Sequence, residues 1–136
     1  FNVIPYTGVI PQGLVLANLL RADNMFQNVV FTGGLPPLLS LEKVGNATSI
    51  FRGASFTGDI PTSLNPEVLT FGQRFFTSPA VFSTTSYSDL LIRLEANNVN
   101  NNVTFWGGNS KYNASGKTAR DLLIARGWAI TDGGLE

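Results

Sequence analysis

The chain contains neither cysteine nor histidine among its 136 residues. Without cysteine it has no disulfide, no thiol nucleophile and no thiolate ligand for a metal. Without histidine it lacks the commonest general base and metal ligand, and with them the Ser-His-Asp arrangement. We therefore expect a protein that is not an enzyme, with no catalytic residues, no cofactor and no metal site.

Charged residues are also scarce, at 13% of the chain. The nine basic and nine acidic residues are scattered singly, and their charges cancel to a net charge of zero. No basic stripe is available to follow a phosphate backbone, so we do not expect nucleic-acid binding. No apolar run approaches the ~20 residues that a membrane-spanning helix needs, so we do not expect insertion into a membrane.

The most informative feature that is present is a 25-residue repeat. Residues 24–48 and 49–73 are identical at seven positions without a gap, where unrelated stretches would match at roughly one or two. The recurring positions are Phe1, Phe26, Phe51 and Phe76; Tyr6, Phe31 and Phe56; Thr7, Thr32 and Thr57; Gly8, Gly33 and Gly58; Pro11, Pro36 and Pro61; and Leu14, Leu39 and Leu64. In the fourth copy Val81-Phe82 replaces the second aromatic only loosely, and the repeat has ended by about residue 83.

A fixed period of this length is typical of stacked coils, whose recurring aromatic and aliphatic side chains bury one another in ladders. The glycine after the threonine suits a positive φ or a close approach to the next coil, and the proline suits the end of a short strand. The prediction is an α/β fold whose residues 1–82 form a solenoid of about three coils and a partial fourth.

Residues 83–136 have a different pattern. The segment 86–98 predicts an amphipathic helix capped by Ser86 or Ser88, and residues 103–106 predict a strand. A second helix is expected between a cap at Ser115 and a stop at Gly127, followed by a strand over 128–131. Strand, helix and strand in this order predict a parallel crossover unit that closes the stack as a cap within the same compact domain.

The repeat, with its Phe/Tyr-Thr-Gly-x-Ile/Leu-Pro core and trailing leucine, resembles the BspA-type leucine-rich repeat of bacterial surface proteins and some phage tail proteins. The tail GGNSKYNASGKTARDLLIARGWAITDGG resembles the terminal module that often closes such proteins, with its Gly-Trp-x-Ile-Thr-Asp-Gly-Gly ending. The resemblance implies a leucine-rich-repeat-like solenoid outside the cell, on a cell surface or a virion. It also implies a recognition or adhesion function toward a protein or glycan on a cell surface, without pointing to any binding residue.

The residues themselves suggest where such a ligand would bind. Trp and Tyr supply rigid, amphipathic contact area, and neighbouring asparagines are common where sugars or protein surfaces are bound. The candidates outside the repeat are Phe71, Tyr87, Trp106, Tyr112, Asn98 and Asn101. The alternative interpretation is that Trp106, like Trp128, packs in the core beneath the cap.

Two other functions remain open. The first residue is already mid-pattern, so we expect either that the array begins before this chain or that another polypeptide covers its N-terminal coil, which would make the chain an assembly subunit. A weaker alternative is nucleotide binding through Gly116-Lys117-Thr118, which match the end of a phosphate-binding loop. The match is incomplete, because Lys111 stands where such a loop needs its first glycine.

Overall fold

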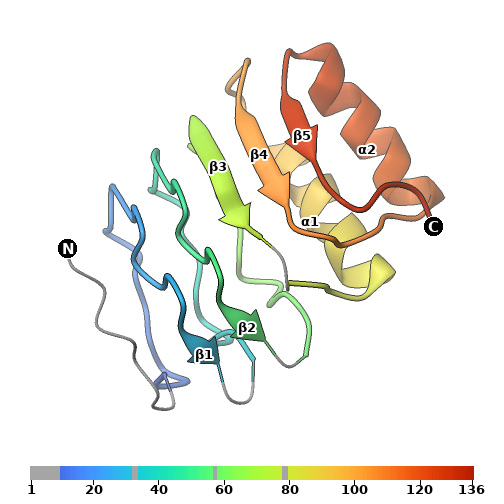
Figure 1. Cartoon of the computed structure of the whole chain (residues 1–136). Helices are drawn as coiled ribbons and strands as arrows, with labels where there is room; N and C mark the ends of the chain where they lie inside the picture. Colours follow the sequence, from blue (N-terminus) through green and yellow to red (C-terminus); the bar gives the residue numbers. More distant parts are fainter. Residues whose placement is uncertain (1–9, 32–33, 57, 78–79) are drawn as a thin grey trace.

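The computed structural model describes residues 10–136 apart from 32–33, 57 and 78–79, and it is a mixed α/β structure (Figure 1). In chain order the elements are β1 (Val30–Phe31), β2 (Ser55–Phe56), β3 (Phe71–Phe76), α1 (Thr84–Asn97), β4 (Thr104–Gly107), α2 (Ala114–Ala125) and β5 (Ala129–Thr131). The strands form a pair, β1–β2, and a three-stranded sheet in the order β3–β4–β5, and every pairing is parallel.

One ladder of parallel pairs runs through nearly the whole described chain. Isolated bridges join Arg21 to Asn46 and Asn46 to Phe71, and the sheet then continues the same row. Its next pairs are Phe71 with Thr104 and Thr104 with Ala129. Three of these four steps therefore equal one period of the repeat, and the longer one contains α1. We call each strand or bridged segment of this ladder a rung.

Backbone hydrogen bonds hold neighbouring coils together in this register. The amide of Ala22 donates to the carbonyl of Asn46 at 3.0 Å, and the amide of Ala47 donates to the carbonyl of Phe71 at 3.0 Å. Two further bonds of the same kind run from Phe26 to Ile50 and from Phe51 to Phe75. Coils that are joined by the backbone in this way bring equivalent side chains directly above one another, as the repeat predicts.

The recurring phenylalanines form the predicted ladders. The rings of Phe26 and Phe51 stack with centroids 5.5 Å apart and an angle of 8° between their planes. Phe51 stacks in the same way on Phe76 at 5.3 Å and 12°. In the second ladder the ring centroid of Phe56 lies 5.0 Å from that of Phe31 and 5.4 Å from that of Phe82. Phe82 therefore replaces the second aromatic more fully than the sequence indicates, while Phe1 and Tyr6 lie outside the described residues.

The backbone also bends at equivalent places in successive coils. Asn24, Ser49 and Arg74, which occupy the same position in successive repeats, all have positive φ angles, of 56°, 57° and 56°. The predicted positive φ of the glycine after threonine is found at Gly58, where φ is 87°. Gly8 and Gly33 fall outside the described residues. Asparagine and glycine enter this left-handed region readily, whereas serine and arginine do so less often.

Both helices begin earlier than the sequence predicts. The cap of α1 is Ser83, whose side chain accepts a hydrogen bond from the Ser86 amide at 3.2 Å. The cap of α2 is Asn113, which accepts from the Gly116 amide at 3.0 Å. The predicted caps Ser86, Ser88 and Ser115 lie inside the helices, because a cap is the extended residue whose side chain reaches an amide three positions further on. The predicted end of α2 is confirmed, since Gly127 follows it with a φ of 83°.

The two helices pack against each other and cover one side of the β3–β4–β5 sheet (Figure 1). A single hydrophobic cluster extends from Ile10 in the first coil to Trp128 beside β5. The coils and the helix-bearing segment therefore share one core. Neither described helix is long and apolar enough to cross a bilayer.

Candidate functional site

The helices leave one side of the ladder uncovered (Figure 1). Side chains alternate along each strand, so Gly72 and Phe105 are buried while their neighbours Phe71, Thr104 and Trp106 are exposed or half-buried. We define the strand face as the outward-pointing residues of the rungs. They are Arg21, Asp23, Asn46, Thr48, Phe71, Gln73, Arg74, Thr104, Trp106, Ala129 and Thr131.

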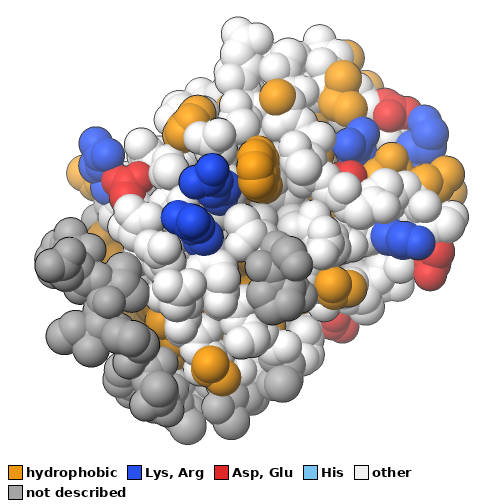
Figure 2. All heavy atoms as spheres, viewed as in Figure 1, with side chains coloured by type: hydrophobic (Ala, Val, Ile, Leu, Met, Phe, Trp, Pro, Cys, Tyr) orange, Lys and Arg blue, Asp and Glu red, His pale blue; other side chains and the backbone are white. Residues whose placement is uncertain are grey.

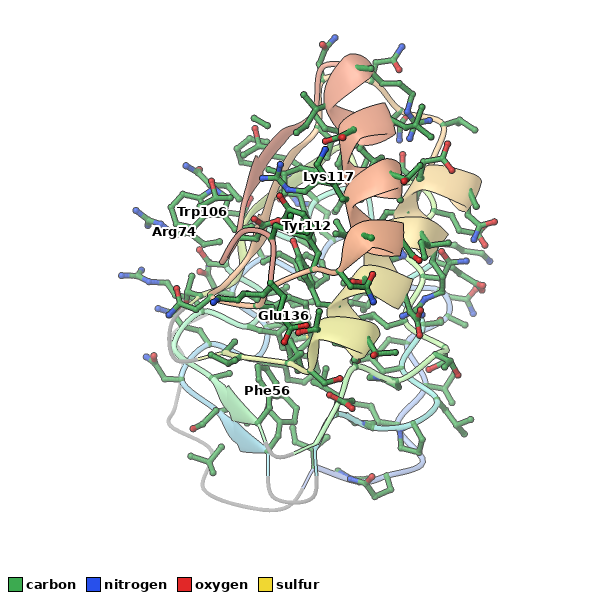
Figure 3. The ribbon with its side chains drawn as sticks, turned by 90° about the vertical axis from the view of Figure 1, so that its right-hand side faces the viewer. Phe56, Arg74, Trp106, Tyr112, Lys117 and Glu136 are labelled. Atoms are coloured by element: carbon green, nitrogen blue, oxygen red, sulfur yellow. The ribbon has the colours of Figure 1, made fainter. Side chains whose placement is uncertain are left out.

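Near the middle of the strand face an aromatic ring and a cation lie together. The guanidinium carbon of Arg74 is 5.9 Å from the centre of the Trp106 ring. Figure 3 shows both side chains projecting from the sheet on the side away from the helices. Arg74 lies in the irregular second half of β3. Its positive φ and the shift in pairing between Gly72 and Phe76 interrupt the regular alternation of side chains there. At this distance the cation and the ring attract one another.

The strand face carries more positive than negative charge, although the chain is neutral overall. Arg21 is neutralised by Asp23, with a nitrogen–oxygen distance of 2.8 Å. Arg74 is exposed and has no carboxylate partner among the described residues. Figure 2 shows basic side chains near the centre of this view, surrounded by uncharged polar atoms and single apolar side chains, with acidic groups toward the margins.

Two of the predicted binding residues are buried and hydrogen-bonded inside the protein, which removes them from the candidate site. Tyr87 is fully buried in α1, and its hydroxyl donates to an Oδ of Asp132 at 2.9 Å. Burial, together with the neighbouring Asp132 carboxylate, raises the pKa of Tyr87 well above its usual value. Asn98 is buried as well, and its amide donates to the carbonyls of Pro66 and Leu69 at 2.9 and 3.0 Å. Both make internal contacts, because a tyrosine or asparagine pointing inward can satisfy its polar atoms on the backbone or on a carboxylate.

The other predicted residues separate into two groups. Tyr112 is also buried, at 8% exposure, with the Arg120 guanidinium 5.0 Å from its ring centre, and it lies beside the C-terminal tail rather than on the strand face. Asn101 is exposed in the loop before β4. Trp106 and Phe71 do lie on the strand face, and the side chain of Phe71 is 39% exposed.

Arg74, Gln73 and Thr131 are strand-face residues that the sequence reasoning missed. A usable signal was present in the sequence, because Asp23, Thr48 and Gln73 occupy one phase of the repeat and each follows a small residue, Ala22, Ala47 or Gly72, which the structure buries. Thr131 pairs with Trp106 across β4 and β5. The pairing of Phe71 with Thr104 brings Thr104 and Trp106 onto the same face as these residues. The repeat does not predict this pairing, because α1 lies between β3 and β4 and makes the step longer than one period.

The Gly116-Lys117-Thr118 string is an ordinary first turn of α2. A Cβ on Gly116 would stand 2.5 Å from the Ser88 hydroxyl, so this glycine allows α1 and α2 to approach closely. Lys117 forms an ion pair with Asp121 along the helix, and the Thr118 hydroxyl donates to the carbonyl of Ala114. The geometry thus assigns these residues to helix packing and to the helix surface.

The Thr-Asp-Gly-Gly ending of the chain is organised by a buried ion pair. Asp132, whose side chain is 2% exposed, accepts hydrogen bonds from the Arg120 guanidinium at 2.9 and 3.3 Å. It also accepts from the Tyr87 hydroxyl and the Gly134 amide. Asp132 therefore fastens the tail to both helices, and this explains the motif by packing rather than by chemistry.

Within the described ranges no group of three acidic residues is placed to hold a metal ion. Comparison of the chain with family models, with curated proteins and with solved structures gave no match.

Proposed function

We propose that the chain is a non-enzymatic, extracellular recognition module of a phage tail or bacterial surface protein. It binds a host or cell-surface ligand through the strand face. The architecture we propose for it is a leucine-rich-repeat-like solenoid of the BspA type, closed by the helix-bearing C-terminal segment. The observation that carries the proposal is the Arg74–Trp106 pair, in which an exposed guanidinium lies beside a half-buried indole ring on the strand face.

The physical character of this surface supports binding. Tryptophan and arginine are enriched among the residues that contribute most to the free energy of binding at interfaces. Here they stand on strands of a sheet whose opposite side is covered by two helices (Figure 1), so a partner would order few additional groups on binding. The surrounding threonine, asparagine and glutamine side chains offer hydrogen bonds without the desolvation cost of charges.

Binding of the labelled chain to intact bacterial and animal cells tests the proposal. Trp106→Thr, which installs the residue found at the paired position Thr131, is expected to weaken cell binding by roughly tenfold or more. Leu122→Ser is the matched control, because Leu122 is exposed on α2, away from the strand face. Equal binding by the two variants, or no binding by the parent chain to any cell, would refute the proposal.

One observation favours the assembly function as a second candidate. Leu14, Leu16 and Leu19 are only half-buried, whereas their counterparts in the next repeat, Leu39, Leu41 and Val44, are completely buried. The first described coil therefore exposes positions that belong to the core in the next coil, and apolar surface of this kind favours association. Sedimentation at rising concentration tests this candidate. An assembly subunit is expected to associate through this end, with Leu16→Glu abolishing association, and a monomer at all concentrations would exclude it.

A further inference from the structure

The geometry points to a carboxylate-bearing carbohydrate, such as a uronate or sialate polymer, as the ligand of the Arg74–Trp106 pair. This inference rests on the proposed function and names the class of ligand that the strand face would bind. The sugar ring lies against the accessible part of the half-buried Trp106 ring, and the carboxylate binds the Arg74 guanidinium.

The cation is suited to a carboxylate in particular. A guanidinium is planar and presents its N–H groups as a fork that matches the two oxygens of a carboxylate. Its attraction to the Trp106 ring holds the Arg74 side chain in one place, so less side-chain entropy is lost when the anion binds. Because no described carboxylate pairs with Arg74, a ligand carboxylate has no internal competitor there.

The neighbouring rungs supply what a sugar needs besides its charge. Thr131 pairs with Trp106, and Thr104 pairs with both Phe71 and Ala129, so hydroxyl and aromatic groups alternate within one surface. Hydroxyls bind sugar hydroxyls, and aromatic faces accept the apolar C–H side of a pyranose ring. Since neighbouring strands lie about 4.8 Å apart, the five rungs from Arg21 to Ala129 span about 19 Å, enough for several sugar units of an extended chain.

The charge of the strand face favours a carboxylate-bearing carbohydrate over more highly charged polymers. A polyphosphate or nucleic acid carries a charge on every unit and requires a row of cations along its path. On the strand face Arg21 is already paired with Asp23. The cations here without a described ion pair are therefore Arg74 and the exposed Arg52, which follows the bridged Phe51, and two such cations do not form a row along the path of a polyanion. A polymer whose carboxylates are separated by neutral sugar hydroxyls fits this distribution better.

The repeat itself provides a variant that removes the charge with little effect on the fold. Arg74 has a φ of 56°, and Asn24, in the same phase of the period, has the same φ. Asparagine is among the residues that enter this conformation most readily, so Arg74→Asn is expected to keep the melting temperature unchanged. Arg74→Lys retains the charge but loses the planar fork.

The test measures binding of the whole chain to polygalacturonate, hyaluronate and polysialate. Each polymer is compared with its own carboxyl-reduced form, in which the acid has become a primary alcohol. We expect at least one acidic polymer to bind roughly tenfold or more tightly than its reduced form. Arg74→Asn should abolish this preference, and Arg74→Lys should retain only part of it.

Three results would overturn the inference: no binding to any of the acidic polymers, equal binding to the reduced forms, or an undiminished preference in Arg74→Asn. Cell binding that is lost in Trp106→Thr but shows no preference for acidic sugars would retain the recognition function and indicate a protein or neutral glycan instead. The absence of cell binding by the parent chain would reject the recognition function itself.

Discussion

The coils of residues 10–76 and the helix-bearing segment of residues 84–136 connect successive parallel rungs by two different kinds of segment. Both place parallel rungs in the same ladder, and the step from Thr104 to Ala129 has the same length as the step from Asn46 to Phe71. In the coils the segment that returns to the next rung consists of turns that pack Leu, Ile and Pro side chains, whereas in the C-terminal segment it contains an α-helix. The backbone ladder is therefore common to both regions, and the segment that returns to the next rung can vary.

A second contact recurs in both regions, at different ends of the rung. Asn28 and Asn102 both have positive φ, and each places its side chain beside a glycine one repeat period later, Gly53 and Gly127, which also has positive φ. In both cases the asparagine backbone amide donates to the carbonyl of the residue before that glycine. The same local solution thus joins neighbouring coils whether or not a helix lies between them.

The largest effect is expected in the coils, from Phe51→Ala. Phe51 is completely buried and stacks on both Phe26 and Phe76. Removing such a ring leaves a cavity in the middle of the ladder and should lower the free energy of unfolding by about 3 to 5 kcal/mol. Chemical denaturation followed by circular dichroism measures this loss. Phe71→Ala, at an exposed ring one rung away, serves as the control, and an equal loss there would contradict the role of the ladder.

A comparable loss is expected in the helix-bearing segment from Asp132→Asn. The substitution leaves the partly buried Arg120 without its carboxylate partner, and breaking a buried pair in this way typically costs about 3 to 5 kcal/mol. Thermal unfolding provides the measurement. Asp121→Asn removes the exposed pair with Lys117 and should leave the melting temperature nearly unchanged. If both substitutions had the same small effect, the buried pair would not be what fastens the tail.

A smaller and more selective effect is expected from alanine at two glycines of positive φ. Gly127→Ala and Gly58→Ala both force alanine into the left-handed region, at a cost of about 1 to 2 kcal/mol. At Gly127 the new Cβ would also stand 2.1 Å from the Asn102 side chain, whereas at Gly58 it would meet nothing within 4 Å. Urea denaturation should therefore find Gly127→Ala the more destabilised variant. The reverse order would show that the contact between Asn102 and Gly127 does not constrain the fold.

The smallest effect concerns pH and is confined to the helix-bearing segment. The pKa of Tyr87 is raised in the folded chain by burial and by Asp132, from a usual value of 10.0. The unfolded chain therefore loses this proton first, and stability should decline as the pH rises above about 10. Tyr87→Phe should show a shallower decline over that alkaline range. Phenolate absorbance of the folded parent chain that showed all tyrosines titrating together near the usual value would contradict this.

The sequence predicted the ladders and the order of the C-terminal elements because both depend on local spacing. The stacked rings of Phe26, Phe51 and Phe76 follow directly from their period. The parallel pairing of β4 and β5 follows from a strand–helix–strand order. The helix starts were misplaced because several serines could act as caps, and only the backbone conformation selects Ser83.

The candidate site was less predictable, because it depends on contacts between distant parts of the chain. Whether Tyr87 faces solvent or Asp132 is decided by the packing of α1 against the C-terminal tail, 45 residues away in sequence. Arg74 reaches Trp106 only because β3 pairs with β4 across α1 and has an irregular register. Neither the Tyr87–Asp132 contact nor the Arg74–Trp106 contact follows from the 25-residue period of the sequence.

The continuity of the ladder through both regions is tested most directly by tryptophan fluorescence during chemical denaturation of the parent chain and of Phe51→Ala. Both tryptophans, Trp106 and Trp128, lie in the helix-bearing segment, whereas the substitution lies in the coils. If the two regions form one cooperative structure, the fluorescence midpoint should fall together with the circular-dichroism midpoint in the variant. A fluorescence transition that stays at the parent midpoint while the coils unfold earlier would contradict a single continuous ladder.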